Sequence, residues 1–409
     1  MRTLKSLLPI FAFAVSASMM SAAQQMWVGT WAASQQIPEQ PNALPSADLR
    51  DVTLRETVHV SCAGSMIRVH LSNAFGTLPL HLTSVHIARP TSSGSSAIVS
   101  ASDRKLLFNG SPEIIIPPGA DYISDPIAYP LAALSELTIS IHVEGEPGQQ
   151  TGHPGSRQTT FYAPGDLTAA TDMSSTRKTE HWYMLSGVDV QTSSSAYSIV
   201  VLGDSITDGH ATTTNGNDRW TDVLAQRLQA SAGKRNTGVL NQGIGGNHLL
   251  TDGLGPNALA RFDRDVLAQT GVRYLIVLEG INDLGGLTRS GEQAQKAHDE
   301  LVHRMVGAYQ QMIDRAHAHG IKVYGATVMP DGGSGYYHPD AASEEDRQQI
   351  NAWIREPGHF DAVIDFDKVM ADPANPRQLL PTYDSGDHLH PGPFGYRAMG
   401  QAVALTLFQ

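Results

Sequence analysis

The chain has 409 residues, of which 41% are hydrophobic and 17% are charged, and this length is sufficient for two domains. Its 28 basic residues are outnumbered by 40 acidic ones, which gives a formal net charge of −12 at pH 7. Because an acidic surface repels phosphate groups, we do not expect nucleic acid to be a partner.

The first residues predict export. Arg2 and Lys5 precede an apolar run at residues 7–20, and the small residues Ser21-Ala22-Ala23 follow it. This order is typical of a secretory signal peptide, so we expect residues 1–23 to be removed and the protein to be secreted, into the periplasm or the medium. The apolar run is shorter than the about 20 residues that span a bilayer, and no later segment is continuously apolar for that length, so we expect no membrane span.

Cys62 is the only cysteine in the sequence. Export leads to an oxidising compartment, but one cysteine cannot form an internal disulfide, so stability must come from a hydrophobic core. Val58, Val60 and Ile67 lie close to Cys62 in the sequence. We therefore expect a buried and unreactive thiol rather than a catalytic one, which would need a partnered histidine.

Residues 24–190 show the period-two pattern of antiparallel strands. Apolar and polar residues alternate in the segments 67–72 and 137–143. Asn109-Gly110 predicts a hairpin turn, and it separates two apolar triplets, residues 106–108 and 114–116. We predict a β-sandwich domain, since so many apolar residues at alternate positions need a shared interior.

A polar linker at residues 191–196 marks a change of architecture, because strands alternate with helices after it. The predicted strands include residues 199–202, 274–278, 323–328 and 362–364. The predicted helices are residues 220–230, 292–319 and 343–355, the last opened by a capping box at Ser343-Glu344-Glu345-Asp346. Continuous apolar strands are covered on both faces, so residues 197–409 are predicted to form a doubly wound α/β domain with a parallel sheet.

Four short blocks stand out in the second half of the chain. They are Gly203-Asp204-Ser205, Asn241 to Gly246, Gly280 to Asp283, and Asp387 to Pro391. Three of them follow strands, and the functional residues of doubly wound sheets collect at the carboxyl ends of strands. Together the blocks supply a nucleophile, donors for an oxyanion and a base, which acyl transfer through a serine ester requires.

With these blocks in this order, residues 195–409 resemble the GDSL, or SGNH, hydrolase superfamily, which is named for Ser, Gly, Asn and His in four blocks. Further segments resemble a secreted two-domain branch with an N-terminal β-sandwich, namely residues 27–31, 68–73, 219–220, 332–337 and 360–366. The resemblance implies a flavodoxin-like three-layer α/β/α fold for the second domain and the activity of an acylesterase or arylesterase.

The resemblance makes Ser205 the nucleophile, and a tight turn after a strand would expose its hydroxyl group. His390 is the expected base, because an imidazole can accept the hydroxyl proton near neutral pH. Asp387, three positions earlier, can hold one ring nitrogen in the donor tautomer while the other faces Ser205. Pro391 restricts the backbone of His390 and helps to aim it.

The resemblance also implies an oxyanion hole. Its expected donors are the backbone N–H groups of Ser205 and Gly246 and the side-chain amide of Asn282. Taken alone, Asn282-Asp283 would rather indicate a strand-end turn that caps a helix, and Gly246 could equally be a packing glycine, so both functional assignments depend on the joint pattern of the four blocks.

Two neighbouring residues could compete for these roles. Adjacent side chains on an extended strand point to opposite faces, so we expect Asp204 to brace the turn rather than to partner the base. His388 has an aspartate only one residue away, which is poorly placed to orient it, so we expect it to be solvent-facing or structural. The order Ser, Asp, His also occurs in α/β-hydrolases, but the segment 203–207 lacks the second glycine of their Gly-x-Ser-x-Gly elbow.

No metal-binding pattern is evident, and we expect no metal and no cofactor. His298, His303, His317 and His319 lie on or near one predicted helix, but a spacing of two puts His317 and His319 on different faces.

The segment 331–339 contains three glycines and is expected to be too flexible for the core. Tyr336 and Tyr337 within it are candidate substrate-binding residues, because a mobile rim could offer aromatic faces to a sugar or acyl group. An ordinary surface loop is the alternative.

These observations predict a secreted serine esterase for short acyl chains, with acetyl groups on carbohydrate as the expected substrate. The expected partner is thus a small ester or an acetylated carbohydrate. A lipase or arylesterase, and an acyltransferase that uses the same residues, are the alternatives of similar chemistry. A carbohydrate-binding protein with a vestigial hydrolase site is the alternative of another class, and the oligomeric state is left open.

Overall fold

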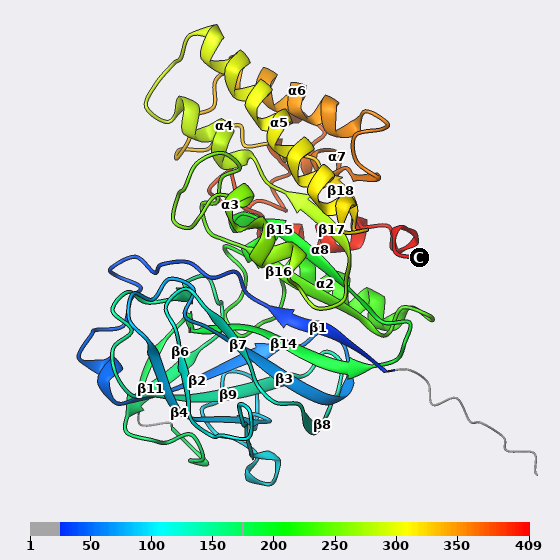
Figure 1. The fold of residues 1–409 in the computed structure, drawn as a ribbon. Coiled ribbons are helices and arrows are strands. Elements are labelled where there is room, and N and C mark those ends of the chain that lie inside the picture. The colour runs from blue at the N-terminus through cyan, green and yellow to red at the C-terminus, as the bar shows by residue number, and fades with distance from the viewer. Residues whose placement is uncertain (1–24, 174–175) are drawn as a thin grey trace, which may run out of the picture.

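The computed structural model describes residues 25–173 and 176–409, which form an all-β part and an α/β part stacked on one another (Figure 1). Each part has its own hydrophobic core. The predicted signal peptide, residues 1–23, lies outside the described residues. Within the described chain we find no helix with the length and apolar character needed to cross a membrane.

The all-β part is a sandwich of antiparallel sheets, as predicted. One sheet contains β1 (Met26–Ala32), β14 (Leu185–Thr192), β3 (Gly64–Ser72), β7 (Asp121–Ile123) and β8 (Ile127–Leu131). The other contains β12 (Arg177–Thr179), β11 (Thr160–Pro164), β2 (Val52–His59), β9 (Glu136–Val143), β4 (Leu80–Ala88), β5 (Arg104–Lys105) and β6 (Ile114–Ile116). The short strands β10 (Gly152–His153) and β13 (Trp182–Tyr183) pair separately.

The alternating pattern holds in β3 but not in β9. In β3, Ile67, Val69 and Leu71 are buried while Arg68 and His70 are partly exposed, as the pattern predicts, although Ser72 at the end of the strand is buried. In β9 the polar face is buried as well. Arg55 covers part of this face, because its buried guanidinium donates to Ser140 Oγ and to the carbonyl oxygens of Ser96, Leu167, Thr168 and Ala170.

The predicted hairpin was wrong in its pairing. Asn109 and Gly110 do form a turn with positive φ angles of 52° and 78°, and Phe108 bridges Ser111 across it. The strand β6 that follows pairs with β4, however, and residues 106–108 form no strand with it. The long apolar strand β4 competes more effectively for β6 than a triplet does.

The α/β part has a parallel sheet of five strands. They are β16 (Thr237–Gly243), β15 (Tyr197–Gly203), β17 (Val272–Leu278), β18 (Lys322–Ala326) and β19 (Ala362–Ile364), in this spatial order. Numbered along the chain, the order is 2-1-3-4-5, which is that of flavodoxin-like folds. The predicted fold class is therefore confirmed.

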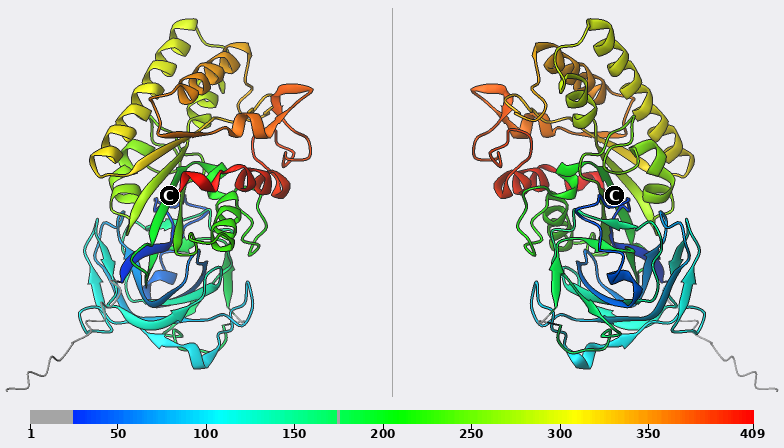
Figure 2. Two further views of the ribbon diagram at one scale, coloured as in Figure 1. Left: turned by 90° about the vertical axis from the view of Figure 1, so that its right-hand side faces the viewer. Right: turned by 90° about the vertical axis from the view of Figure 1, so that its left-hand side faces the viewer.

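Helices cover both faces of this sheet (Figure 2). They are α1 (Ser205–Asp208), α2 (Trp220–Ala230), α3 (Ala258–Phe262), α4 (Ile281–Thr288), α5 (Gln295–Ala318), α6 (Ala341–Arg355), α7 (Phe366–Met370) and α8 (Pro393–Ala402). The helix α2 packs against α8, whereas α5 packs against α3 and α6. A small two-stranded sheet, β20 (Ala371–Asp372) and β21 (Asn375–Leu379), precedes α8.

Several element boundaries differ from the sequence-based expectation by a few residues, as at α5, which begins at Gln295 rather than at residue 292. The helix α6 begins at Ala341, because Asp340 is its N-cap and accepts a hydrogen bond from the N–H of Ser343 at 2.8 Å. Ser343 thus lies inside the first turn rather than at the cap. The strand β14 continues through Thr192, two residues into the expected linker.

The sandwich contacts the parallel sheet at β16, an edge strand. β1 lies against β16, and an added Cβ on Gly238 would be only 1.9 Å from the carbonyl oxygen of Gly29. Ser198 Oγ donates to the same oxygen at 3.1 Å. Backbone therefore meets backbone at this boundary, and glycine at position 238 permits the close approach.

Cys62 is buried in the sandwich core, as expected. Burial raises the pKa of its thiol to about 12. The thiolate is therefore strongly disfavoured at neutral pH.

Candidate active site

The carboxyl ends of three adjacent strands bring the first three sequence blocks together. Ser205 is the first residue of α1, directly after β15, and Gly246 lies in the loop after β16. Asn282 lies in the first turn of α4, after β17. As expected, Asp204 braces the turn, because its buried carboxylate caps α1 and accepts from the N–H of Ile206 at 2.8 Å.

Ser205, His390 and Asp387 form a continuous chain of hydrogen bonds. Ser205 Oγ lies 2.8 Å from His390 Nε2, and His390 Nδ1 lies 2.6 Å from Asp387 Oδ2. A carboxylate only accepts, so Nδ1 carries the proton and Nε2 is free to accept from the serine hydroxyl. The other carboxylate oxygen, Oδ1, accepts from the backbone N–H of His390 at 2.8 Å and of Leu389 at 3.0 Å, which fixes the turn that carries the ring.

These hydrogen bonds keep the carboxylate of Asp387 ionised. Burial would raise the pKa of this carboxyl, but the hydrogen bonds from the His390 ring and backbone hold it well below its usual range. Asp387 is therefore an ionised acceptor at any pH near neutrality, which is what orienting an imidazole requires.

The expected oxyanion donors lie at the same end of the sheet. Gly246 has a φ of +63°, a left-handed conformation that favours glycine. Within the described residues, the backbone N–H groups of Ser205 and Gly246 donate to no other protein group. The Asn282 amide donates one hydrogen to the carbonyl of Asn247 at 2.7 Å, which leaves its second hydrogen for a ligand.

Tyr337 fixes the orientation of the Asn282 amide. Its hydroxyl donates to Asn282 Oδ1 at 2.5 Å, and its ring is only 4% exposed. The ring packs on α4, where a Cβ added to Gly285 would be 2.2 Å from it. The expectation that residues 331–339 are too flexible for the core was therefore wrong for Tyr337. Tyr336 is half exposed, with the Arg289 guanidinium 4.1 Å from its ring centre.

A buried guanidinium, that of Arg261 in α3, lies beneath the site. It donates to the carbonyl oxygens of Gly203 at 3.0 Å and Gln242 at 2.6 Å, and to Glu279 Oε1 at 3.1 Å. It also donates to Asn247 Oδ1 at 2.8 Å. Sequence reasoning missed Arg261, and the only available signal was a single basic residue in the otherwise apolar helix α3.

Several carboxyls near Arg261 have raised pKa values. Burial raises the pKa of Asp204 to about 7, and the neighbouring Asp283 contributes further. Burial also raises the pKa of Glu279 well above its usual range, and that of Asp283 although the N–H groups of Leu249 and Leu250 bond to it. These acids retain protons more strongly than exposed carboxyls do.

Two further histidines lie near His390. His388 bonds to Asp384 Oδ2 at 2.6 Å and is about half exposed, so it is both structural and solvent-facing. The His210 ring lies 4.1 Å from the His390 ring, centre to centre, and sequence reasoning missed it. Burial and the neighbouring His390 lower the pKa of His210. A histidine five residues after the serine was the available signal.

His210, Asp387 and His390 also place ligand-type atoms within 4.8 Å of one another, the one such group of three in the described chain. Two of the three side chains already belong to the hydrogen-bonded chain with Ser205. The absence of a metal stays a prediction. His298 and His317 bond to separate carboxylates, those of Asp346 and Asp361.

Comparison with known proteins identifies the α/β part. Residues 201–398 match the model of the GDSL-like Lipase/Acylhydrolase family. No curated protein matches the chain. Among solved structures, a GDSL-like lipase from Bacteroides thetaiotaomicron is 20% identical, with 50% of this chain and 84% of that chain covered and a TM-score of 0.36.

Two further solved structures are similar to about the same extent. An acetyl xylan esterase is 18% identical, with 50% of this chain and 96% of that chain covered and a TM-score of 0.36. An alpha/beta hydrolase enzyme from the metagenome of Lake Arreo, Spain, is 18% identical, with 50% and 92% covered and a TM-score of 0.37.

Replacing Tyr337 by Phe tests the orientation of the Asn282 amide. Loss of one hydrogen bond, worth on the order of 1 kcal/mol, is expected to lower kcat for 4-nitrophenyl acetate by about 5- to 10-fold with little change in KM. Tyr122→Phe, in strand β7 of the sandwich, is the matched control and should leave kcat unchanged. Equal kcat values for Tyr337→Phe and the native enzyme would contradict the assigned contact.

The buried Asp331 predicts a pH effect on stability. Burial raises its pKa from 3.8 to about 6, so between these values the folded state binds more protons than the unfolded state. The free energy of unfolding should therefore fall as pH rises from about 4 to 7, by about 3 kcal/mol relative to Asp331→Asn. Urea denaturation across this pH range measures the difference. The exposed Asp314→Asn is the control, and parallel curves for Asp331→Asn and native protein would contradict the burial effect.

Proposed function

The protein is an ester hydrolase whose residues 201–398 form a GDSL-like lipase/acylhydrolase domain, and we propose that it is a secreted serine esterase that removes short acyl groups, foremost acetyl groups on carbohydrate. The nucleophile is Ser205, the base is His390, and Asp387 orients the base. Ser205 and Gly246 N–H groups and the Asn282 amide stabilise the oxyanion.

The observation that carries the proposal is the hydrogen-bonded chain from Ser205 Oγ through His390 to Asp387, with distances of 2.8 and 2.6 Å. An unassisted serine hydroxyl is a poor nucleophile at neutral pH. A neutral imidazole with its proton on Nδ1, the tautomer inferred from the contact with Asp387, can accept the serine proton on Nε2, and the ionised Asp387 stabilises the resulting imidazolium.

The reaction proceeds in two acyl transfers. Ser205 Oγ attacks the ester carbonyl as its proton moves to His390 Nε2, and the carbonyl oxygen becomes an oxyanion. His390 then gives the proton to the departing alcohol, which leaves an acyl-Ser205 ester. Water, deprotonated by His390, attacks this ester, and collapse of the second oxyanion releases the acid and returns the proton to Ser205.

The oxyanion needs donors that are in place before the reaction begins. Ser205 N–H is at the first position of α1, where a helix leaves its N–H groups without internal partners. Gly246 is constrained by its left-handed backbone conformation. The Asn282 side chain is constrained by its hydrogen bonds to the carbonyl of Asn247 and to the Tyr337 hydroxyl. A rigid site of this kind reorganises little as the charge develops.

A short acyl group fits the surroundings of Gly246. The Leu254 side chain lies 3.4 Å from the position of a Cβ on this glycine and so limits the space beside the oxyanion donors. Tyr336 supplies a half-exposed aromatic ring at residues 331–339, of the kind that can pack on a sugar, and we retain it as a proposed substrate contact.

Esters with larger apolar groups are a second candidate. Phe394, four residues after His390, is an apolar side chain that is 71% exposed. Apolar side chains in such positions favour a lipase or an arylesterase. An acyltransferase would use the same residues and pass the acyl group to a sugar hydroxyl instead of water.

We further propose that residues 1–23 direct export and are removed. In this proposal residues 24–190 form the sandwich domain, residues 191–196 link it to the rest, and residues 197–409 form the catalytic domain. The separate hydrophobic cores of the two parts support this division.

Two substitutions test the chemical roles. Ser205→Ala should lower turnover of 4-nitrophenyl acetate by about 10⁴-fold or more, because it removes the nucleophile. Asn282→Ala should lower kcat by about 10² to 10³-fold, the usual effect of losing one oxyanion donor. Thermal melting provides the control for folding. Near-native turnover in a folded Ser205→Ala variant would refute the mechanism.

A substrate panel tests the acyl and alcohol specificity. The enzyme is expected to prefer 4-nitrophenyl acetate over the octanoate by at least about 10-fold in kcat/KM, since Leu254 restricts the acyl side. It should also release acetate from acetylated xylan. A preference for octanoate would instead favour the lipase or arylesterase, and transfer to added sugar in place of hydrolysis would favour the acyltransferase.

A further inference from the structure

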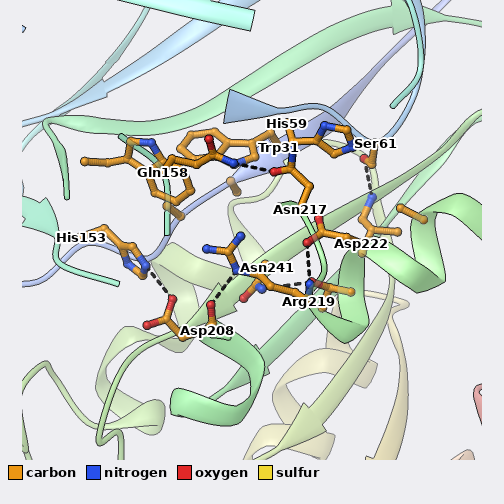
Figure 3. A pocket seen from close by; sticks show the side chains of 16 residues that line it. Trp31, His59, Ser61, His153, Gln158, Asp208, Asn217, Arg219, Asp222 and Asn241 are labelled. Carbon is orange, nitrogen blue, oxygen red and sulfur yellow. Dashed lines mark hydrogen bonds and ion pairs between the residues drawn. The ribbon is translucent and has the colours of Figure 1, made fainter. Parts of the chain in front are cut away.

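A small cavity lies between the sandwich and the first two helices of the catalytic part (Figure 3). Its volume is about 40 Å³, enough for a few water molecules at about 10–15 Å³ each and far too small for a sugar. His153 of β10, Asp208 of α1 and Arg219 before α2 contribute to its wall. The cavity therefore marks an interface rather than a substrate site.

His153 has hydrogen-bond acceptors on both ring nitrogens. Nδ1 lies 2.8 Å from the carbonyl oxygen of Ser34, and Nε2 lies 2.9 Å from Asp208 Oδ1. The carbonyl only accepts, so Nδ1 carries a proton. A hydrogen bond between His153 Nε2 and Asp208 Oδ1 then requires a second proton, which either the ring nitrogen or the carboxyl oxygen carries.

The His153 and Asp208 side chains are only 4% and 5% exposed. A buried imidazole and carboxyl that share a proton are strongly coupled, because separating them would leave an unpaired charge or an unsatisfied polar atom. The ring is further held by Trp182, which stacks on it at 5.7 Å between ring centres.

Asp208 is the last residue of α1, the helix that begins with Ser205. The carbonyl of Ser205 accepts from the N–H groups of Gly209 and His210, both at 2.9 Å, so the turn after Asp208 folds back onto the serine. A displacement of the Asp208 end is therefore transmitted to Ser205 within one helical turn. Such a shift would change the 2.8 Å distance to His390.

Arg219 contacts the same end of α1 from the other side. Its Nε donates to the carbonyl of Asp208 at 2.6 Å, and another guanidinium nitrogen donates to the carbonyl of Ser156 at 2.6 Å. Gly155 packs directly on the Asp208 carboxylate, where a Cβ would be 1.8 Å from Oδ2. The segment 153–156 of the sandwich is thus fitted to the nucleophile helix.

We infer that His153 is a positioning residue for the nucleophile, and that the sandwich is a working part of the catalytic unit through the contact of His153 with Asp208. The inference rests on the proposed function. It assigns the sandwich a role in catalysis that does not require a carbohydrate ligand of its own.

Replacing His153 by Ala in the full chain tests the inference. The variant should lose about 100-fold in kcat for 4-nitrophenyl acetate with little change in KM, because a misplacement of about 1 Å has effects of this size. Its Ser205 should also react about 100-fold more slowly with a fluorophosphonate, which reports on the serine without an ester substrate.

Asp208 supplies the conservative comparison. Asp208→Ala should behave like His153→Ala. In Asp208→Asn, the amide can donate to Nε2 of a neutral ring whose Nδ1 still donates to Ser34, so most of the lost kcat should return. If His153→Ala fails to fold, Asp208→Ala and Asp208→Asn make the same test with the ring in place.

His86 and Asp103 provide a matched control pair, because they bond at 3.0 Å and both lie within the sandwich, His86 in β4 and Asp103 just before β5. His86→Ala should lower the melting temperature at most and leave kcat unchanged. A folded His153→Ala variant with native kcat and native fluorophosphonate reactivity would overturn the inference. Absence of ester turnover in the native protein would instead refute the proposed function.

Discussion

One buried guanidinium ties together the three strand ends on which the site is built. Strand ends leave carbonyl groups without sheet partners, and buried carbonyls need donors. Arg261 offers five donors in a rigid fork, and it bonds to the carbonyls of Gly203 in β15 and Gln242 in β16 and to the carboxyl of Glu279, the residue after β17. A lysine, with its single charged nitrogen, could not span these three positions.

The same guanidinium begins a polar chain that reaches the oxyanion donors. Arg261 bonds to the side chain of Asn247, the carbonyl of Asn247 accepts from Asn282, and Asn282 accepts from Tyr337. This series of hydrogen bonds therefore connects Arg261 with Tyr337, a residue more than 70 positions later in the sequence. Burial raises the pKa values of Asp204 and Glu279, whereas hydrogen bonds hold the pKa of the half-exposed Asp387 below its usual range and keep this carboxylate ionised.

The regular elements of the α/β part could be predicted because its strands are continuously apolar and its helices have clear periodicity. The helix at residues 220–230 has the predicted limits. The four sequence blocks contain the residues that lie at the carboxyl ends of the strands and in the loop that carries His390. Arg261 and His153 could not be found in this way, because their roles depend on contacts between segments far apart in the chain. Glycine content misled the interpretation of Tyr337, since Gly285 opens space for a packed ring rather than for motion. The predicted pairing of β6 was wrong because several strands compete for the same partner, and which of them pairs depends on the whole assembled sheet.

The meeting of β1 with β16 has a consequence for the integrity of the molecule in solution. An uncovered edge strand offers a row of backbone donors and acceptors to any extended segment of another molecule, and parallel sheets have few polar side chains with which to deter it. Here β1 packs on the face of β16, with Gly29 against Gly238, and Ser61 Oγ of the sandwich accepts a hydrogen bond from the backbone N–H of Val239 in β16 at 2.9 Å. The first half of the chain thus satisfies a backbone donor of an edge strand in the second half, a group that would otherwise be open to pairing with another molecule.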